Sequence, residues 1–137
     1  MDPRSDLGLD PHGVKRKAKF TVIAELEREL LAAEHVLRTE YSFDLAEPRY
    51  RACLDLISKA AEQRHEMAEL LIDMYTSKRI RSEPVAYLMH VLRWPVIQDW
   101  ASQSLREDPT SIATGAGRAN ILAAYSDDWD NRDFYTF

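Results

Sequence analysis

One short polar segment of the sequence has side chains at a spacing that suits metal binding. Glu62 and His65 are three residues apart, which places a carboxylate and an imidazole on one face of a helix. Two-metal sites in helical bundles use two such Glu-x-x-His motifs and two further glutamates. This chain has a single motif, so we assign no metal ligand, no cofactor and no catalytic residue. A metal or small-ligand site that uses Glu62, His65 and His90 is kept as an alternative.

Three further features that could do chemistry have a structural explanation. His90 lies in an apolar run, where we expect its ring to donate to a backbone carbonyl or a tyrosine. Cys53 has no neighbouring histidine to act as a base, so we expect a buried small hydrophobe. The motif Thr114-Gly-Ala-Gly117 lacks the lysine of a phosphate-binding loop, so we expect its glycines at a helix C-terminus and a turn.

The end of the chain, residues 127–137, alternates acidic and aromatic side chains. Aromatic side chains often dominate the binding energy of protein interfaces. We predict partner binding by the residues Asp127, Asp128, Trp129, Asp130, Asp133, Phe134 and Tyr135. In the alternative interpretation, Trp129 and Phe134 fold back and cover the domain, because exposed aromatic side chains are costly in a monomer.

The composition bounds the class of protein. The 137 residues suffice for one domain with its own core, and scarce glycine favours helix. The net charge of −5 argues against nucleic-acid binding, which needs a basic face. The lone cysteine suits a reducing compartment. With no apolar signal segment and no membrane span in the sequence, we expect a cytoplasmic protein.

Hydrophobic periodicity predicts a helix over residues 14–40. Its apolar residues recur every three or four positions, as is typical of one buried helix face: Ile23, Leu26, Leu30, Ala33 and Leu37. A second helix is predicted from Pro48 to Thr76. We expect it to be continuous, because neither glycine nor proline interrupts it.

Proline residues mark the starts of the later helices. Pro84 and Pro95 each suit a first helical turn, where the missing N–H group is not needed. Asp108-Pro109 predicts another helix start, and residues 118–125 predict a last helix.

The pair Pro84–Trp94 and Pro95–Leu105 resembles the two short antiparallel helices of a HEAT-type repeat. The similarity covers this hairpin alone, and it implies a binding scaffold made of stacked helix pairs. We expect the hairpin to pack between the first two helices.

The sequence therefore predicts an all-α fold, a single compact domain of five to six helices that is HEAT-like or an irregular bundle. Residues 1–13 are expected to form a flexible arm, 14–126 the helical domain and 127–137 an acidic aromatic tail. We expect a non-enzymatic protein that binds a protein partner through an acidic surface, of the immunity-protein or adaptor kind. The alternatives are the ligand-binding protein described above and a homodimer that pairs through the first helix.

Overall fold

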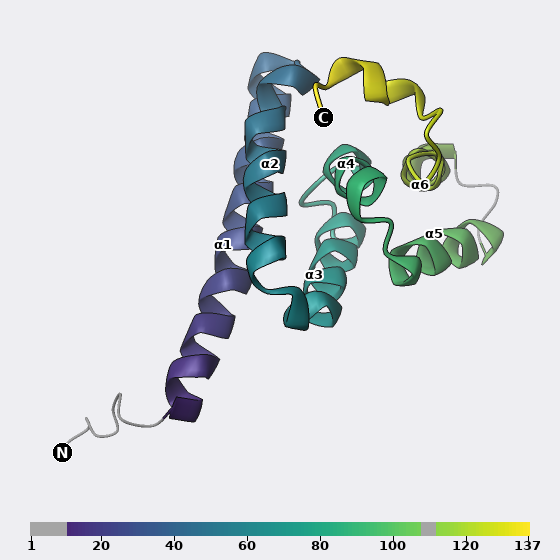
Figure 1. Ribbon diagram of the computed structural model, residues 1–137. Coiled ribbons are helices and arrows are strands. Elements are labelled where there is room, and N and C mark those ends of the chain that lie inside the picture. The colour runs from purple at the N-terminus through teal and green to yellow at the C-terminus, as the bar shows by residue number, and fades with distance from the viewer. Residues whose placement is uncertain (1–10, 108–111) are drawn as a thin grey trace.

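The chain is built from helices throughout its described part. The computed structural model describes residues 11–107 and 112–137, with side chains from 22 to 107 and from 115 onward. The described residues form six α-helices followed by a short C-terminal 3₁₀ helix, in the arrangement of Figure 1. The elements are α1 (Pro11–Glu40), α2 (Phe43–Lys59), η1 (Ala61–Gln63), α3 (Arg64–Thr76), α4 (Ser82–Leu92), α5 (Pro95–Glu107), α6 (Ile112–Ala123) and η2 (Asp130–Phe134). The all-α prediction is confirmed.

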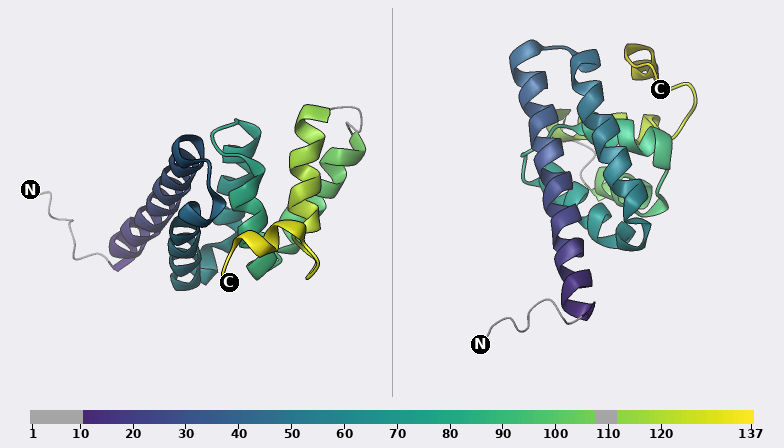
Figure 2. Two further views of the ribbon diagram at one scale, coloured as in Figure 1. Left: turned by 90° about the horizontal axis from the view of Figure 1, so that it is seen from above. Right: turned by 60° about the vertical axis from the view of Figure 1, so that its left-hand side comes forward.

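The helices stack as three consecutive pairs in two layers (Figure 2). Each even-numbered helix packs on the odd-numbered helix before it. Along the stack, α3 contacts α1 and α5, while α4 contacts α2 and α6. The odd-numbered helices therefore form one layer and the even-numbered helices the other, around a shared core.

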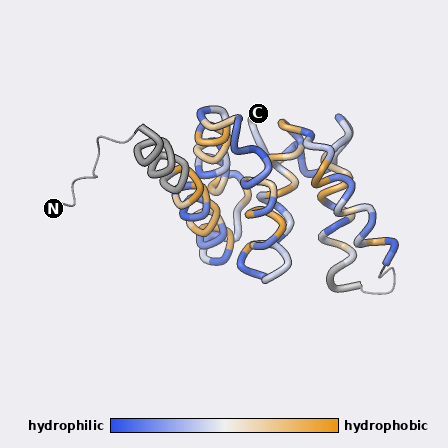
Figure 3. Tube along the Cα trace, turned by 90° about the horizontal axis from the view of Figure 1, so that it is seen from below, coloured by the Kyte–Doolittle hydropathy of each residue, from blue (hydrophilic) through white to orange (hydrophobic). Residues whose placement is uncertain are grey.

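The predicted apolar seam of the first helix lies in that core. Leu26, Leu30, Ala33 and Leu37 are buried, and Ile23 packs partly buried at the edge. Figure 3 shows hydrophobic and hydrophilic residues alternating along the helices, as expected when each has one buried side. However, α1 packs directly on α2 (Figure 1). The expectation that residues 84–105 would lie between these two helices is therefore wrong.

The predicted second helix is divided in two at Ala60. Its backbone leaves the helical region, with φ −135° and ψ 45°, and the turn η1 follows before α3 begins. Ala60 and Gln63 are both buried at this corner. The expectation of one continuous helix is wrong, because burial at the corner sets this break and no glycine or proline marks it.

Two helix boundaries also differ from their predicted positions. α2 begins at Phe43 and contains Pro48, although we predicted that the helix would begin at this proline. Losing one backbone hydrogen bond at Pro48 is tolerated because the added turn buries Ala46 and Glu47.

Gly115 and Gly117 lie inside α6 and do not end a helix. The predicted start at Asp108-Pro109 and most of the predicted N-terminal arm lie outside the described residues, but α1 already includes residues 11–13.

The connection between α4 and α5 follows the predicted proline rule. Arg93 ends α4 in the left-handed region with φ 51°, and its N–H donates to the Met89 carbonyl over 2.8 Å. Pro95 then begins α5. α4 and α5 belong to different pairs, and both pack mainly on α6. The HEAT-type resemblance of residues 84–105 stays a prediction, although they do not fold against each other as one hairpin.

Candidate functional site

The aromatic residues of the predicted tail site are largely used inside the molecule. Trp129 is 4% exposed and Tyr135 is 8% exposed. The Tyr135 ring centroid lies 4.8 Å from that of Tyr87, and the Trp129 ring lies 5.2 Å from His90. Tail and even-numbered helices therefore share one aromatic cluster. Trp129 and Tyr135 cannot contact a partner while the tail is docked.

A buried carboxylate, Glu83 of α4, anchors the tail. It is 5% exposed and accepts hydrogen bonds from the side-chain amides of Asn120, over 3.0 Å, and Asn131, over 2.9 Å. The hydroxyl of Tyr135 donates to its other oxygen. Burial and the negative charge of Glu83 raise the pKa of Tyr135, which keeps this hydroxyl protonated. Three neutral donors therefore satisfy one buried charge.

A second buried carboxylate, Glu47 of α2, holds the last residues of the tail. It accepts from the Tyr87 hydroxyl over 2.8 Å and from the Thr136 backbone N–H over 3.1 Å. Burial alone would raise the pKa of Glu47. The hydrogen bonds from Tyr87 and Thr136 and the charge of Arg51 outweigh burial and lower this pKa. The ionised form of Glu47 is therefore part of the docked state.

The outer side of the tail keeps the remaining predicted residues accessible. Asp127, Asp128, Asp130 and Asp133 are exposed, and Phe134 is 51% exposed beside Phe43. Asp127 accepts from the Arg93 guanidinium over 2.6 Å, and this hydrogen bond together with the charge of Arg93 lowers the pKa of Asp127. The structure thus divides the predicted site into buried aromatic anchors and an acidic rim.

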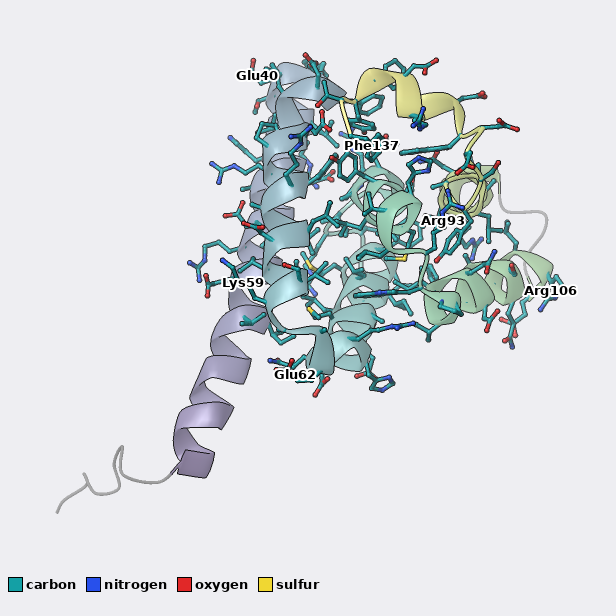
Figure 4. The ribbon with its side chains drawn as sticks, viewed as in Figure 1. Glu40, Lys59, Glu62, Arg93, Arg106 and Phe137 are labelled. Atoms are coloured by element: carbon teal, nitrogen blue, oxygen red, sulfur yellow. The ribbon has the colours of Figure 1, made fainter. Side chains whose placement is uncertain are left out.

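The alternative site at Glu62, His65 and His90 is not assembled. His65 is exposed and lies 3.4 Å from Glu69 on the same helix. The His90 Nδ1–H donates to the Ala124 carbonyl over 2.8 Å, as predicted, and its ring lies 4.9 Å from that of Phe137. Figure 4 shows Glu62 at the opposite end of the molecule from Phe137.

Two features bear on the other chemistry considered from the sequence. Burial raises the pKa of the Cys53 thiol to about 12, which keeps it protonated and unreactive, as expected for a core residue. Within the described ranges, no three His, Cys, Asp or Glu side chains gather closely enough to share a metal ion.

A groove on the odd-numbered layer gathers positive charge. It has a volume of about 680 Å³ and lies between the C-terminal half of α1, the α3–α4 connection and the α5–α6 pair. Among the described residues, four cationic side chains line it against one carboxylate, Glu34: Arg38, Lys78, Arg81 and Arg118. The chain as a whole carries −5, so the groove opposes the overall charge of the molecule.

Glu34 organises the guanidinium groups at the base of this groove. Its side chain is 2% exposed and accepts from the Arg81 backbone N–H over 3.0 Å. The Arg81 Nε lies 3.1 Å and the Arg38 Nε 3.6 Å from the second oxygen. That oxygen receives no well-directed hydrogen bond, so its contacts with both guanidiniums are mainly electrostatic. One carboxylate thus positions two cations that remain more than half exposed.

Aromatic and hydroxyl side chains complete the lining. The rings of Tyr75 and Trp100 meet edge to face, with centroids 5.6 Å apart at 84°. Gly117 permits the approach of Tyr75, because a Cβ atom there would lie 2.3 Å from the tyrosine hydroxyl oxygen. Ser104 accepts a hydrogen bond from the Arg118 guanidinium. The groove therefore combines cations, hydroxyls and a flat apolar surface, the usual elements of a small-molecule site.

Sequence reasoning missed this groove because its residues come from five elements. The one visible signal is the basic turn between α3 and α4, with Lys78, Arg79 and Arg81 close in sequence. The basic side chains of this turn have different surroundings. Arg79 pairs with Glu27 and Asp73 away from the groove, whereas Lys78 has no ion-pair partner among the described residues.

Comparisons with other proteins leave the geometry as the basis for function. None of the described helices combines the length and apolar character needed to cross a bilayer. Searches against protein families, curated proteins and solved structures returned no match.

Proposed function

We propose that this chain is a non-enzymatic binding protein that holds a small anionic ligand in the basic groove. The observation that carries the proposal is the placement of four cationic side chains and one carboxylate around a single groove of about 680 Å³. That size suits a small molecule, for which protein sites are typically about 300–1,000 Å³.

The state of the cations supports binding of phosphate or carboxylate groups. Guanidinium groups match both anions through paired N–H donors. Arg38 and Arg81 keep 57% and 58% of their side chains exposed although both contact Glu34. Each still has N–H donors for a ligand, because a guanidinium carries about five of them. Lys78 adds a charge that no described carboxylate neutralises.

The stacking of helix pairs agrees with a binding role. Two-layer arrays of helix pairs are common scaffolds for binding, and the resemblance of residues 84–105 to a HEAT-type hairpin points the same way.

Calorimetric titration with pyrophosphate tests the proposal. We expect binding by the wild-type chain that weakens as salt is added, and a loss of about tenfold in affinity in Arg38→Ala and Lys78→Ala, since a hydrogen bond to a charged group contributes roughly that much. Arg79→Ala is the matched control, because it removes a cation from the same turn but outside the groove. Equal losses in all three variants, or no binding at millimolar pyrophosphate, would falsify the proposal.

A second candidate function, binding of a protein partner through the acidic rim of the tail, is favoured by one observation. Asp128, Asp130 and Asp133 are exposed around the half-exposed ring of Phe134. Such a surface suits a basic partner, because complementary charge speeds association. The predicted contribution of Trp129 and Tyr135 is withdrawn, since both are buried.

Affinity purification tests this second candidate with the intact chain as bait. We expect a co-purifying protein with a basic surface that is lost with the triple variant Asp128→Asn, Asp130→Asn and Asp133→Asn. Glu62→Asn is the control, because it removes an exposed carboxylate at the far end of the molecule (Figure 4). Equal recovery with all three baits excludes the acidic rim as the binding surface.

A further inference from the structure

We infer that the ligand of the basic groove is a phosphate ester that carries a flat aromatic ring, of the nucleoside diphosphate class. This inference rests on the proposed function and specifies its ligand. It comes from the aromatic lining, which a site for a bare inorganic anion does not need.

The cations call for more than one anionic group. Arg38, Lys78, Arg81 and Arg118 come from three separate parts of the chain, namely α1, the α3–α4 connection and α6. Arg118 is engaged within the chain, so the charge available to a ligand comes from the other three cations, of which Glu34 offsets about one. A ligand with two linked phosphates supplies the charge that balances the rest, and its oxygens accept from several donors at once.

The aromatic residues of the groove favour a ligand that carries an aromatic ring. Tyr75 and Trp100 both line the groove and are only partly buried. Their edge-to-face contact fixes the two rings relative to each other. A nucleobase that stacks on one aromatic side chain gains about tenfold or more in affinity, whichever base it is.

Gly117 of α6 supports a site that uses the Tyr75 ring. Gly117 lines the groove, and any side chain there would displace the Tyr75 hydroxyl, to which its Cβ would approach within 2.3 Å. Its neighbour Gly115 has no such constraint, because a Cβ there would make an ordinary contact of 3.6 Å with Leu105. The close packing that Gly117 permits keeps the Tyr75 ring beside the cations.

The remaining lining suits the sugar that joins a base to its phosphates. Ser82 and Ser104 accept hydrogen bonds from Asn120 and Arg118, so their O–H groups are left to donate to a ligand. Hydroxyl groups both donate and accept, so they pair with ribose hydroxyls without adding charge. The groove thus holds a partner for each part of a nucleotide.

The experiment compares three probes by calorimetry on the full chain without added metal: pyrophosphate, adenosine and adenosine diphosphate. We expect adenosine diphosphate to bind at least about tenfold tighter than pyrophosphate, since base stacking adds to the phosphate contacts. Adenosine alone is expected to bind weakly. Tryptophan fluorescence should respond to adenosine diphosphate more than to pyrophosphate, because Trp100 lines the groove.

A variant separates the ring from the anion. In Trp100→Leu the affinity for adenosine diphosphate should fall to that for pyrophosphate, whose own affinity stays unchanged. Phe134→Leu is the matched control, because it replaces a half-exposed aromatic residue outside the groove. The wild-type comparison of probes stands even if Trp100→Leu does not fold.

The outcomes distinguish this inference from the function on which it rests. Equal affinities for pyrophosphate and adenosine diphosphate overturn the nucleotide class but leave the groove as an anion site. Failure of both phosphates to bind overturns the inference and the proposed function together. Tighter binding of adenosine than of adenosine diphosphate also overturns the inference, because the ring would then bind without the cations.

Discussion

Buried glutamates organise both the docked tail and the basic groove. The donors around the tail glutamate are used up within the chain, whereas those around the groove glutamate remain available to a ligand. Glu83, under the tail, is 5% exposed, and Glu34, under the groove, is 2% exposed. Around Glu83 the donors are neutral amides and a phenol. Around Glu34 the neighbouring groups are the guanidiniums of Arg38 and Arg81.

The chemistry of the donors explains the difference. A tyrosine hydroxyl has one proton to donate, and the Tyr135 hydroxyl donates it to Glu83, so no donor is left for a ligand. A guanidinium has about five N–H groups and a permanent charge, so contact with Glu34 leaves capacity for a ligand. The docked side of the tail is therefore satisfied within the chain, whereas the basic groove stays open to an anion.

One residue connects the two regions. The Asn120 amide donates to Ser82 Oγ, which lines the groove, over 3.2 Å and to Glu83 over 3.0 Å. Its carbonyl oxygen accepts from Trp129 Nε1 over 2.9 Å. The tail and the groove thus share a hydrogen-bond network.

Removal of a tail anchor is expected to have the largest effect. Trp129→Ala should lower the free energy of unfolding by about 3–5 kcal/mol, the usual cost of truncating a buried tryptophan. The variant also leaves the Asn120 carbonyl without its donor. Urea denaturation measures the loss.

Phe134→Ala is the control for this prediction. Its ring is 51% exposed, so we expect a loss of less than about 1.5 kcal/mol, since little apolar area returns to water. Similar small losses in both variants would mean that the tail is not docked in solution, and the contrast with the open groove would fail.

The sequence predicted features that depend on local pattern and missed those that depend on distant contacts. The seam from Leu26 to Leu37 and the helix start at Pro95 follow from periodicity and proline chemistry. The break at Ala60 does not, because burial at a corner fixes it. From the sequence, the glycines of α6 were predicted to lie at a helix C-terminus and a turn. Gly117 is instead required by the close approach of Tyr75, which lies 42 positions earlier in the sequence.

The candidate sites show the same limit. Alternating charge and aromatic rings predicted residues 127–137 as a tail, but its buried partners Glu47 and Glu83 lie far away in sequence and could not be predicted. The groove draws Glu34, Arg81 and Trp100 from two helices and the α3–α4 connection, and no spacing in the sequence connects them.

A pair of glycine variants sharpens the groove side of the comparison. Gly115→Ala should stabilise the chain by about 0.5–1 kcal/mol, because alanine favours helix and its Cβ fits. Gly117→Ala should instead destabilise it by about 1 kcal/mol, since overpacking against the Tyr75 hydroxyl costs about 1–3 kcal/mol and outweighs the helix preference. Thermal and urea unfolding measure both changes.

The Tyr75→Phe background provides the internal check. Without the hydroxyl, the nearest ring atom lies 3.3 Å from the added Cβ, so Gly117→Ala should become close to neutral. A double-mutant cycle gives the coupling directly. If Gly117→Ala is equally destabilising in both backgrounds, the close approach of Tyr75 is not what requires glycine there.

A pH dependence of stability tests the tail side of the comparison. The pKa of Glu47 is below its ordinary value of 4.5 in the folded chain, so the unfolded chain binds more protons near that pH. Its contribution to stability is therefore complete above about pH 4.5 and is lost as the pH falls through the folded pKa.

Glu47→Gln should be less stable than wild type by about 1–2 kcal/mol at pH 7, because an amide cannot accept from both Tyr87 and Thr136 as well as a carboxylate does. The difference should shrink between about pH 5 and pH 3, as the wild-type carboxyl also loses its charge. Urea unfolding across this range measures it, with exposed Glu62→Gln as the control that should show no difference at any pH. A Glu47→Gln deficit that stays constant down to pH 3 would mean that the charge of Glu47 does not contribute to docking of the tail, and the electrostatic side of the comparison with the groove would fail.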